Sequence, residues 1–332
     1  MNTERIARLF VVGLGGGLLL AALIASKAGP GRGGAIELHG RMAETGGWTP
    51  SDLTATVGEP LRLRLTSDDV MHGFAVGQTN WPAVDVKPGE VTEITLTFDH
   101  PGPYTFYCTR WCGLNHWRMR GTLEVSGPAQ AQVTDAPPLY VTLGRDIDAP
   151  HPAPPDALPG RKPSAARGAG LGAPIPTPYL VADYYRAHSP LEVWQSLRTE
   201  ALTRNVTDAD VWDLVAVVWK ANTRLAALNE GKQLYAANCA ACHGENGAGD
   251  GVMAAALKNQ LRANAVRGVS GPANFADATK MLGASPALLQ GKLIRGGMGT
   301  GMPYWGPIFT EAQTWVLVDY LYTFQFEMEA EP

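Results

Sequence analysis

Residues 35–126 alternate apolar and polar side chains along the chain. Two runs show this spacing of two most clearly: Leu61, Leu63 and Leu65, and then Ile94, Leu96 and Phe98. Successive side chains of a strand point to opposite faces of a sheet, so the spacing predicts strands with one buried face. Turn signals such as Lys87-Pro88-Gly89 separate the runs. The pattern therefore predicts a small all-β sandwich or barrel.

The pattern changes further along the chain. Residues 127–178 are rich in proline, alanine and glycine without a sustained apolar period, which is typical of a semi-rigid linker with extended polyproline character. From residue 179 onward, apolar positions recur at helical spacing. Together these stretches predict a β domain, a Pro/Ala-rich linker and an all-α region.

Residues 1–28 precede the β region and have a different character. Arg5 and Arg8 come before an uncharged run that extends from Leu9 to Ser26. This layout predicts either a single N-terminal membrane helix or a cleaved export signal. We expect a retained membrane helix, and both interpretations place the rest of the chain outside the cytoplasm.

The composition of the chain limits the kinds of protein and partner that it can represent. A chain of 332 residues is long enough for several domains. Its formal net charge is −4, with 27 basic and 31 acidic residues and no long charged run, so we expect no nucleic-acid partner. Four cysteines are too few for a disulfide scaffold in a chain of this size, and each pair has a metal-type spacing.

Cys108 and Cys112 share one segment with His116 and Met119, and His72 precedes them. Thiolate, imidazole and thioether ligands together suit copper. Two thiolates in one loop can both bridge a pair of copper ions. His72 and His116 would then each supply one ligand, Met119 would cap one copper ion, and a backbone carbonyl would cap the other. A Cys108–Cys112 disulfide and a zinc site are the alternatives, although the methionine favours copper over zinc.

These side chains, in this order on a β scaffold, resemble the CuA domain of haem-copper oxidase subunit II, which also occurs in some nitric oxide reductases. The resemblance covers residues 58–126 and implies a cupredoxin-like fold with five side-chain ligands: His72, Cys108, Cys112, His116 and Met119. It also implies that the backbone carbonyl of Arg110 is a copper ligand. Most such subunits carry Glu at this position, where it touches a magnesium ion, so that magnesium site is not expected here.

Residues 239–243 form a second chemical motif. Cys239 and Cys242, followed by His243, have the C-x-x-C-H spacing of covalent haem c attachment, in which both thiols bind the haem and the histidine binds its iron. A redox-active C-x-x-C pair is the alternative. A downstream methionine should be the sixth iron ligand. We predict Met302, which precedes a proline and the C-terminal helix, with Met298 as the alternative.

Residues 229–327 resemble a class I cytochrome c domain. This resemblance implies one covalently bound haem c. It also implies that Pro272, in the segment Gly271-Pro272-Ala273-Asn274-Phe275, places a carbonyl against the ring of His243.

An internal repeat precedes this domain. The segment that begins at Thr207 and contains Trp212 is echoed by the segment that begins at Thr310 and contains Trp315. Each copy begins with a threonine followed by acidic residues, as a capped helix does. Two interpretations remain open: two ordinary amphipathic helices, or residues 179–228 as a degenerate cytochrome c half whose haem motif has been lost.

The two metal sites carry the functional prediction. No nucleophile, acid–base pair or phosphate-binding loop accompanies them, so we expect electron transfer rather than substrate chemistry. The resemblance implies a non-catalytic redox subunit of a membrane terminal oxidase. Its partners would be a haem-copper catalytic subunit that reduces O2 and a donor that is a cytochrome c, a copper protein or a quinol-oxidising complex.

Two alternatives remain: the electron-input subunit of a CuA-type nitric oxide reductase, and a free-standing electron shuttle anchored in the membrane. In each case the chain would be multidomain, with an N-terminal membrane helix, a cupredoxin-like sandwich over residues 35–126, a linker, and an all-α cytochrome c domain. Both redox domains would lie on the periplasmic side.

Overall fold

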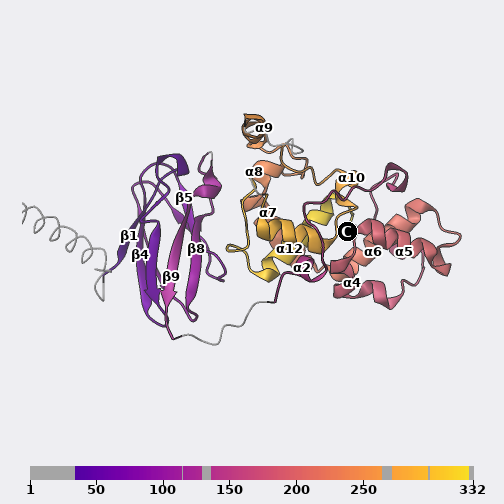
Figure 1. The fold of residues 1–332 in the computed structure, drawn as a ribbon, viewed down its shortest axis with the longest axis horizontal. Coiled ribbons are helices and arrows are strands. Elements are labelled where there is room, and N and C mark those ends of the chain that lie inside the picture. Colours follow the sequence, from indigo (N-terminus) through magenta and orange to yellow (C-terminus); the bar gives the residue numbers. More distant parts are fainter. Residues whose placement is uncertain (1–33, 114, 129–135, 264–270, 298–299, 329–332) are drawn as a thin grey trace, which may run out of the picture.

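The computed structural model describes residues 34–113, 115–128, 136–263, 271–297 and 300–328. They form a β sandwich and a larger body of helices (Figure 1). The predicted membrane helix or export signal, residues 1–28, lies outside this part of the chain. Within the described ranges, no helix is long and apolar enough to span a bilayer.

The sandwich consists of two sheets, as the alternating pattern predicts. One sheet has the strand order β2-β1-β4-β7, and the other has the order β3-β9-β8-β5-β6. The strands are β1 (Ile36–Gly40), β2 (Trp48–Thr49), β3 (Asp52–Thr56), β4 (Pro60–Ser67), β5 (His72–Val76), β6 (Val84–Val86), β7 (Val91–Thr97), β8 (Gly102–Cys108) and β9 (Arg120–Ser126). The predicted cupredoxin-like β domain is thereby confirmed as a fold.

The core of the sandwich follows from the period of two. The leucines of β4, Leu61, Leu63 and Leu65, are buried, whereas the arginines between them are exposed or half-buried. Fully burying each leucine contributes about 1.5–3 kcal/mol. Trp48 lies at the centre of this core, with its ring 5.6 Å from that of Phe74. The packed core thus gives a rigid base to the end of the sandwich at which β5 begins.

The helical body has one hydrophobic core that extends from residue 147 to residue 328. Its helices are α2 (Leu139–Thr142), α3 (Ala165–Gly170), α4 (Ala182–Ala187), α5 (Pro190–Thr199), α6 (Asp208–Asn222), α7 (Leu225–Asn238), α8 (Ala240–His243), α9 (Ala254–Ala263), α10 (Ala278–Met281), α11 (Pro286–Arg295) and α12 (Glu311–Leu321). The ring of Trp219 on α6 lies 5.3 Å from Tyr322 and 5.4 Å from Phe326. Residues 179–228 and 229–327 therefore share one core.

The repeated segments begin helices in the same way. Thr207 caps α6 by accepting the N–H of Asp210, and Thr310 caps α12 by accepting the N–H of Gln313, each at 3.2 Å. A serine followed by a proline likewise starts both α5 and α11. These shared starts are compatible with both interpretations of the repeat, and the degenerate cytochrome half remains a prediction.

The segment predicted as a linker, residues 127–178, differs from that expectation over residues 136–178. This segment carries α2 and α3 and buries Ile147, Ala153 and Ala157 against the helices. The indole N–H of Trp212 on α6 donates to the carbonyl of Ala157 at 3.0 Å. Small side chains that are buried at isolated positions produce no apolar periodicity in the sequence. The composition of this segment therefore predicted a linker.

Candidate metal centres

The candidate copper ligands gather at one end of the sandwich. His72 opens β5, and Cys108 closes β8. Because these strands are antiparallel, with Phe74 opposite Cys108, the start of β5 lies beside the end of β8. The loop between β8 and β9 supplies the remaining candidates.

Three candidate donors surround the thiol of Cys108. Its Sγ lies 3.8 Å from Nδ1 of His72, 3.9 Å from Sγ of Cys112 and 3.3 Å from the carbonyl oxygen of Arg110. His72, Cys108 and Cys112 are all buried. The two sulfur atoms are much farther apart than the ~2.05 Å of a disulfide, and both cysteines are free, so the disulfide alternative does not describe this structure.

Two further donors surround Cys112. Its Sγ lies 3.5 Å from Nδ1 of His116 and 3.9 Å from Sδ of Met119, which is fully buried. Donor atoms that each lie about 2.0–2.3 Å from one tetrahedral ion are roughly 3.5–3.8 Å apart. The six candidate groups are therefore spaced as ligands of shared metal ions are, and the thioether among them favours copper.

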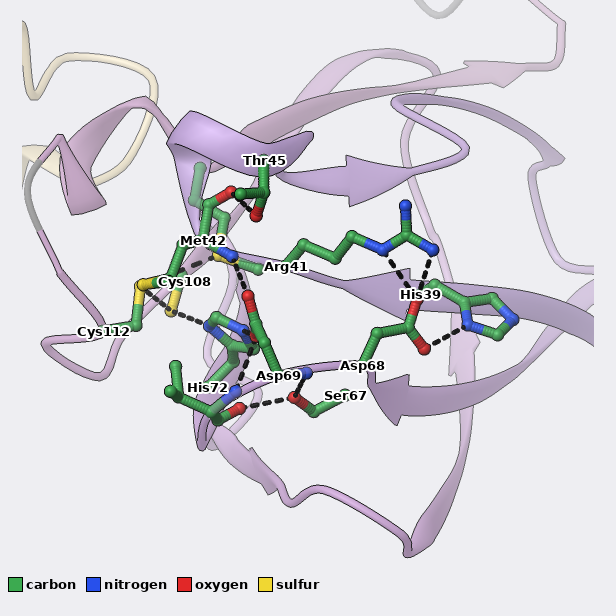
Figure 2. A network of polar contacts seen from close by, with 12 residues as sticks. His39, Arg41, Met42, Thr45, Ser67, Asp68, Asp69, His72, Cys108 and Cys112 are labelled. Atoms are coloured by element: carbon green, nitrogen blue, oxygen red, sulfur yellow. Dashed lines mark hydrogen bonds and ion pairs between the residues drawn. The ribbon is translucent and has the colours of Figure 1, made fainter.

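Asp69 orients the ring of His72 (Figure 2). Nε2 of His72 donates to Oδ1 of Asp69 at 2.7 Å, so the lone pair of Nδ1 faces the thiols. The carboxylate is itself held by the backbone N–H groups of Met42 and Val70 at 2.7 and 2.6 Å. Burial lowers the pKa of His72, but hydrogen bonds with Cys108 and Asp69 outweigh it and raise the pKa overall. Sequence reasoning did not assign Asp69 a role, because a carboxylate three residues before a histidine is common.

The thiol pair favours one thiolate. The hydrogen bond from Cys112, with further bonds from His116 and His72, holds the pKa of Cys108 at about 3 although burial opposes ionisation. The same hydrogen bond, followed by burial, raises the pKa of Cys112. A thiolate is the metal-binding form of cysteine, so one ligand is already prepared at neutral pH.

Gly40 of β1 makes room for this site. A Cβ added there would lie 2.9 Å from the ring of Trp48, 3.1 Å from the ring of His72 and 3.2 Å from the methyl group of Met119. Contacts this close would push the histidine or the methionine from its place. No local signal in the sequence marks this glycine, because the approach comes from distant parts of the chain.

The side chain of Arg110 faces Asp85 of β6. Its Nε and Nη2 donate to the two carboxylate oxygens at 2.8 and 3.1 Å, which is a bidentate ion pair. The guanidinium thus occupies the position for which the resemblance predicts a magnesium-binding Glu in other members. Only its backbone carbonyl contacts the candidate copper ligands.

The haem-attachment motif follows α7, as predicted. Cys239 ends that helix, and α8 carries Cys242 and His243. Burial raises the pKa of Cys239 to about 12 and also raises that of Cys242. A redox-active pair needs a lowered thiol pKa, so the microenvironment disfavours that alternative.

His243 is held by a backbone carbonyl, but the carbonyl is not that of Pro272. Nδ1 of His243 donates to the carbonyl of Ala273 at 3.0 Å, whereas the carbonyl of Pro272 approaches Gly249, where an added Cβ would lie 2.7 Å from it. The predicted hydrogen-bond acceptor, the carbonyl of Pro272, is wrong by one residue, because the turn after the proline directs the carbonyl of Ala273 toward the ring. Burial lowers the pKa of His243, so the ring is neutral with Nε2 free to bind iron. These features fit a haem ligand.

Met302 lies in the loop between α11 and α12. It is half-buried against the helical core, and its carbonyl accepts the N–H of Gly297 at 3.1 Å. The alternative ligand, Met298, lies outside the described residues. The choice of Met302 therefore remains a prediction.

The fold and these sites define a redox metalloprotein with a copper-type centre in a β domain and a haem-attachment site in a helical domain. The family described as "Cytochrome C oxidase subunit II, periplasmic domain" matches residues 49–125, and the family described as "Cytochrome c" matches residues 228–325. The chain therefore joins a cytochrome c oxidase subunit II domain to a cytochrome c domain. These domains imply the dinuclear copper centre CuA and a haem c.

Two relatives from Thermus thermophilus, both named "Cytochrome c oxidase subunit 2", are each 42% identical over 79 residues. The match covers 24% of this chain and 58% or 46% of the relative, so the chain spans about half the length of the curated relatives it matches. The solved periplasmic domain of subunit II of cytochrome oxidase from Bradyrhizobium japonicum is 25% identical, with a TM-score of 0.22, and the match covers 23% of this chain and 55% of that one.

Proposed function

We propose that this chain is the subunit II-like electron-transfer subunit of a membrane terminal oxidase. It relays electrons from a donor, through haem c and CuA, to a separate haem-copper catalytic subunit that reduces O2. The observation that carries the proposal is the convergence of six candidate copper ligands in a subunit II domain whose chain also contains a cytochrome c domain.

The chain's residues have distinct roles in this proposal. The side chains of His72, Cys108, Cys112, His116 and Met119 and the carbonyl of Arg110 would hold copper. Cys239 and Cys242 would bind haem covalently, and His243 and Met302 would be its iron ligands. When bound, the two groups supply one-electron oxidation and reduction.

Groups behind the ligands prepare each site for electron transfer. Asp69 fixes the ring of His72, and the carbonyl of Ala273 fixes the ring of His243. Holding ligands in place reduces the rearrangement that accompanies a change of oxidation state. Burial of both copper-site cysteines keeps water from the thiolates.

The proposed setting is the outer face of a membrane. The matched subunit II family is described as a periplasmic domain, which supports an extracytoplasmic position for the redox domains. Residues 1–28 would anchor the chain by one helix. The donor would be a cytochrome c, a copper protein or a quinol-oxidising complex.

One observation favours a second candidate, the electron-input subunit of a CuA-type nitric oxide reductase. Arg110 forms an ion pair with Asp85 within the chain, at the position where most oxidase subunits carry a magnesium-binding Glu. A chain that does not share a magnesium ion with an oxidase catalytic subunit can pair with the catalytic subunit of a nitric oxide reductase.

Gentle extraction from native membranes tests these assignments. We expect a many-helix haem protein to co-purify and the complex to consume oxygen. Nitric oxide turnover without oxygen uptake would assign the second candidate. Isolation of the chain alone would contradict both and leave a free-standing shuttle.

Electron spin resonance of the oxidised protein tests the copper assignment separately. We expect one unpaired electron shared by two copper nuclei, because Cys108 and Cys112 would both serve as ligands of a copper pair. A spectrum from one isolated copper ion would contradict the dinuclear site while leaving the haem assignment untouched.

A further inference from the structure

The sandwich and the helical body meet beside both candidate centres. The sandwich and the helices lie side by side in Figure 1. The loop 303–309, which follows Met302 and leads into α12, contacts the sandwich just after β5 and at the start of β9. The proposed function does not by itself explain this contact. The sandwich residues Gly77, Gln78 and Arg120 take part in it, and Tyr107 of β8 also packs against the helical core.

Gln78 binds three carbonyls of the loop. Its backbone N–H donates to Ile308 at 3.0 Å, and its side-chain amide donates to Gly306 at 2.5 Å and to Phe309 at 2.6 Å. The residue has a φ of 62°, in the left-handed region that non-glycine residues seldom adopt. This uncommon conformation points both donors of one residue at the same loop.

Gly77 brings the two backbones into direct contact. A Cβ added at this position would lie 2.3 Å from the carbonyl oxygen of Pro307 and 2.8 Å from Cα of Ile308. Neither atom belongs to a side chain that can turn away. The two bodies therefore touch without room for even a methyl group.

Arg120 reaches across the same contact. Its Nη1 donates to the carbonyl of Tyr304 at 3.0 Å, and its guanidinium lies over the rings of Tyr304 and Trp305 at 5.2 and 5.4 Å. Arg120 is half-buried, and it is not among the arginines that form ion pairs within the described residues. A carbonyl and two aromatic faces thus compensate a desolvated cation, and they do so only while the bodies are docked.

The position of Arg120 relates the contact to both centres. Arg120 directly follows Met119, a candidate copper ligand, and pairs across the sheet with Tyr107, which precedes Cys108. Tyr304 stands two residues after Met302, the candidate haem ligand. One hydrogen bond therefore joins the side chain of the residue after one candidate ligand, Met119, to the backbone two residues after the other, Met302.

We infer that Arg120 is a positioning residue that locks the loop 303–309 onto the copper domain and supplies the hydrogen-bonded link for electron transfer between haem c and CuA. One electron leaves the ferrous haem, which becomes ferric, and reduces the oxidised copper pair by one; no proton moves. The inference rests on the proposed function. Tunnelling decays less steeply through bonds than across gaps, and docking within one chain replaces a bimolecular encounter.

The test uses the full chain with both cofactors and the variant Arg120→Gln. A light-activated reductant injects one electron into the haem, and the absorbance of the copper centre reports its arrival. We expect transfer to slow by at least about tenfold, since the shorter, neutral side chain loses the hydrogen bond to Tyr304 and the contact with the rings of Tyr304 and Trp305. Both midpoint potentials are measured, so that a change in driving force is accounted for.

Arg118→Gln is the matched control. Arg118 lies on the other side of Met119 and carries the same charge, but it is exposed and lies over the ring of Trp117, 4.8 Å away. The two variants should shift the copper potential by similar amounts, while only Arg120→Gln slows the transfer. Equal rates in the two variants would overturn the inference.

A second readout does not depend on the cofactors. The backbone N–H of Gln78 is protected by the carbonyl of Ile308, so its hydrogen exchange reports docking. We expect faster exchange in Arg120→Gln and in Gly77→Ala, which wedges the backbones apart, but not in Gly160→Ala, where an added Cβ meets nothing within 4 Å. Unchanged exchange in both interface variants would overturn the docking role.

The wild-type chain separates this inference from the proposed function. If the electron reaches copper at a rate that depends on protein concentration, or never does, the relay within the chain is wrong. If the wild-type transfer is intramolecular and the two variants, Arg120→Gln and Arg118→Gln, transfer electrons at the same rate, the proposed relay is supported and the role of Arg120 is wrong.

Discussion

His72 and His243 are each oriented through the ring nitrogen that does not face the metal, but by different partners. A carboxylate, Asp69, holds His72, whereas a neutral carbonyl, that of Ala273, holds His243. A carboxylate makes the imidazole a stronger donor and favours the more oxidised metal. The haem histidine lacks this charge, and burial keeps it neutral. The hydrogen-bond partner of each histidine therefore sets how strongly its imidazole donates to a metal.

Asp69→Asn tests this role. The amide keeps the size of the side chain but removes the charge behind His72, so we expect copper affinity to fall by about 10–100-fold and the copper potential to rise. Competition with a copper chelator and a redox titration measure the two effects. Asp68→Asn is the control, because Asp68 pairs with His39 and Arg41 and not with His72. Equal effects of both variants would contradict the assignment.

Met302→Ala and Met298→Ala distinguish the two candidate iron ligands. We expect Met302→Ala to keep the covalently bound haem but to lose its low-spin spectrum and lower its potential, because a thioether favours ferrous iron. Met298→Ala should resemble the wild type in absorbance and in redox titration. The reverse result would transfer the ligand role to Met298.

Among the helices, α6 anchors the segment that precedes it through one buried carboxylate. Asp213 is 1% exposed and accepts from the backbone N–H of Ser164 at 2.7 Å, from Arg161 at 2.6 Å and from Arg167 at 3.1 Å. Gly168 of α3 packs so closely that an added Cβ would lie 2.3 Å from the carbonyl of Asp213. Polar contacts to one carboxylate thus add to the apolar packing that attaches this proline-rich segment.

Asp213→Ala should destabilise the helical body by about 1–3 kcal/mol, because it leaves the buried backbone N–H of Ser164 without an acceptor. Urea unfolding followed by circular dichroism measures the change. The control is Asp210→Ala, which removes a bond to the same Arg161 from a more exposed side chain and should cost about 1 kcal/mol. Similar losses in both variants would contradict the anchoring role of Asp213.

Asp319 of α12 makes the stability of the helical body depend on pH. It is 9% exposed and accepts from the hydroxyl of Tyr185 at 2.7 Å, and burial raises its pKa from 3.8 to about 6. The native state therefore keeps a proton that the unfolded chain releases. The stability this provides is full below about pH 4 and is lost as the pH rises through 6, a difference of about 3 kcal/mol.

Asp319→Asn should raise the free energy of unfolding at pH 7 by up to about 3 kcal/mol and change it little at pH 4. Urea titrations at the two pH values measure this difference. Asp183→Asn, at an exposed position of the same body, should show no such pH dependence. A variant that gains no stability at pH 7 would contradict the buried, proton-sharing state.

The described residues form two hydrophobic cores with no buried residue in common. Three candidate copper ligands, Cys108, Cys112 and Met119, belong to the sandwich core, and Cys239 of the haem-attachment motif packs against the helical core. A ligand stabilises only the unit whose folded state binds it. The short contact through Gln78 and Arg120 joins the two units without merging their cores.

Removal of copper should therefore act on one unit. Copper present at 1,000 times its dissociation constant contributes about 4 kcal/mol, so a chelator should lower the unfolding temperature of the sandwich only. Scanning calorimetry should show two transitions, of which one moves. A Cys108→Ser chain, which lacks a bridging thiolate, should not respond to the chelator. Equal shifts of both transitions would contradict independent cores.

Local features predicted much of this structure. Alternating leucines in β4 gave a sandwich because strand geometry depends only on neighbouring residues. Cys108, Cys112, His116 and Met119 lie within one loop, so their meeting needed little of the rest of the chain. The packed segment 136–178 was not predicted, because Ala153 and Ala157 are too small and too scattered to show a period. The carbonyl behind His243 was misassigned by one residue, since the exact path of a turn depends on what packs around it.

The amino-acid sequence sufficed to predict a copper-type β domain followed by a helical cytochrome c domain, because both signals depend on side-chain chemistry or on spacing over a few residues. The individual metal ligands remain predictions. Tertiary structure alone decided that Asp69 backs His72, that Asp213 holds the preceding segment, and that Arg120 meets Tyr304. These partners are brought together by packing across the whole fold, and no periodicity or local motif specifies a contact between positions so far apart.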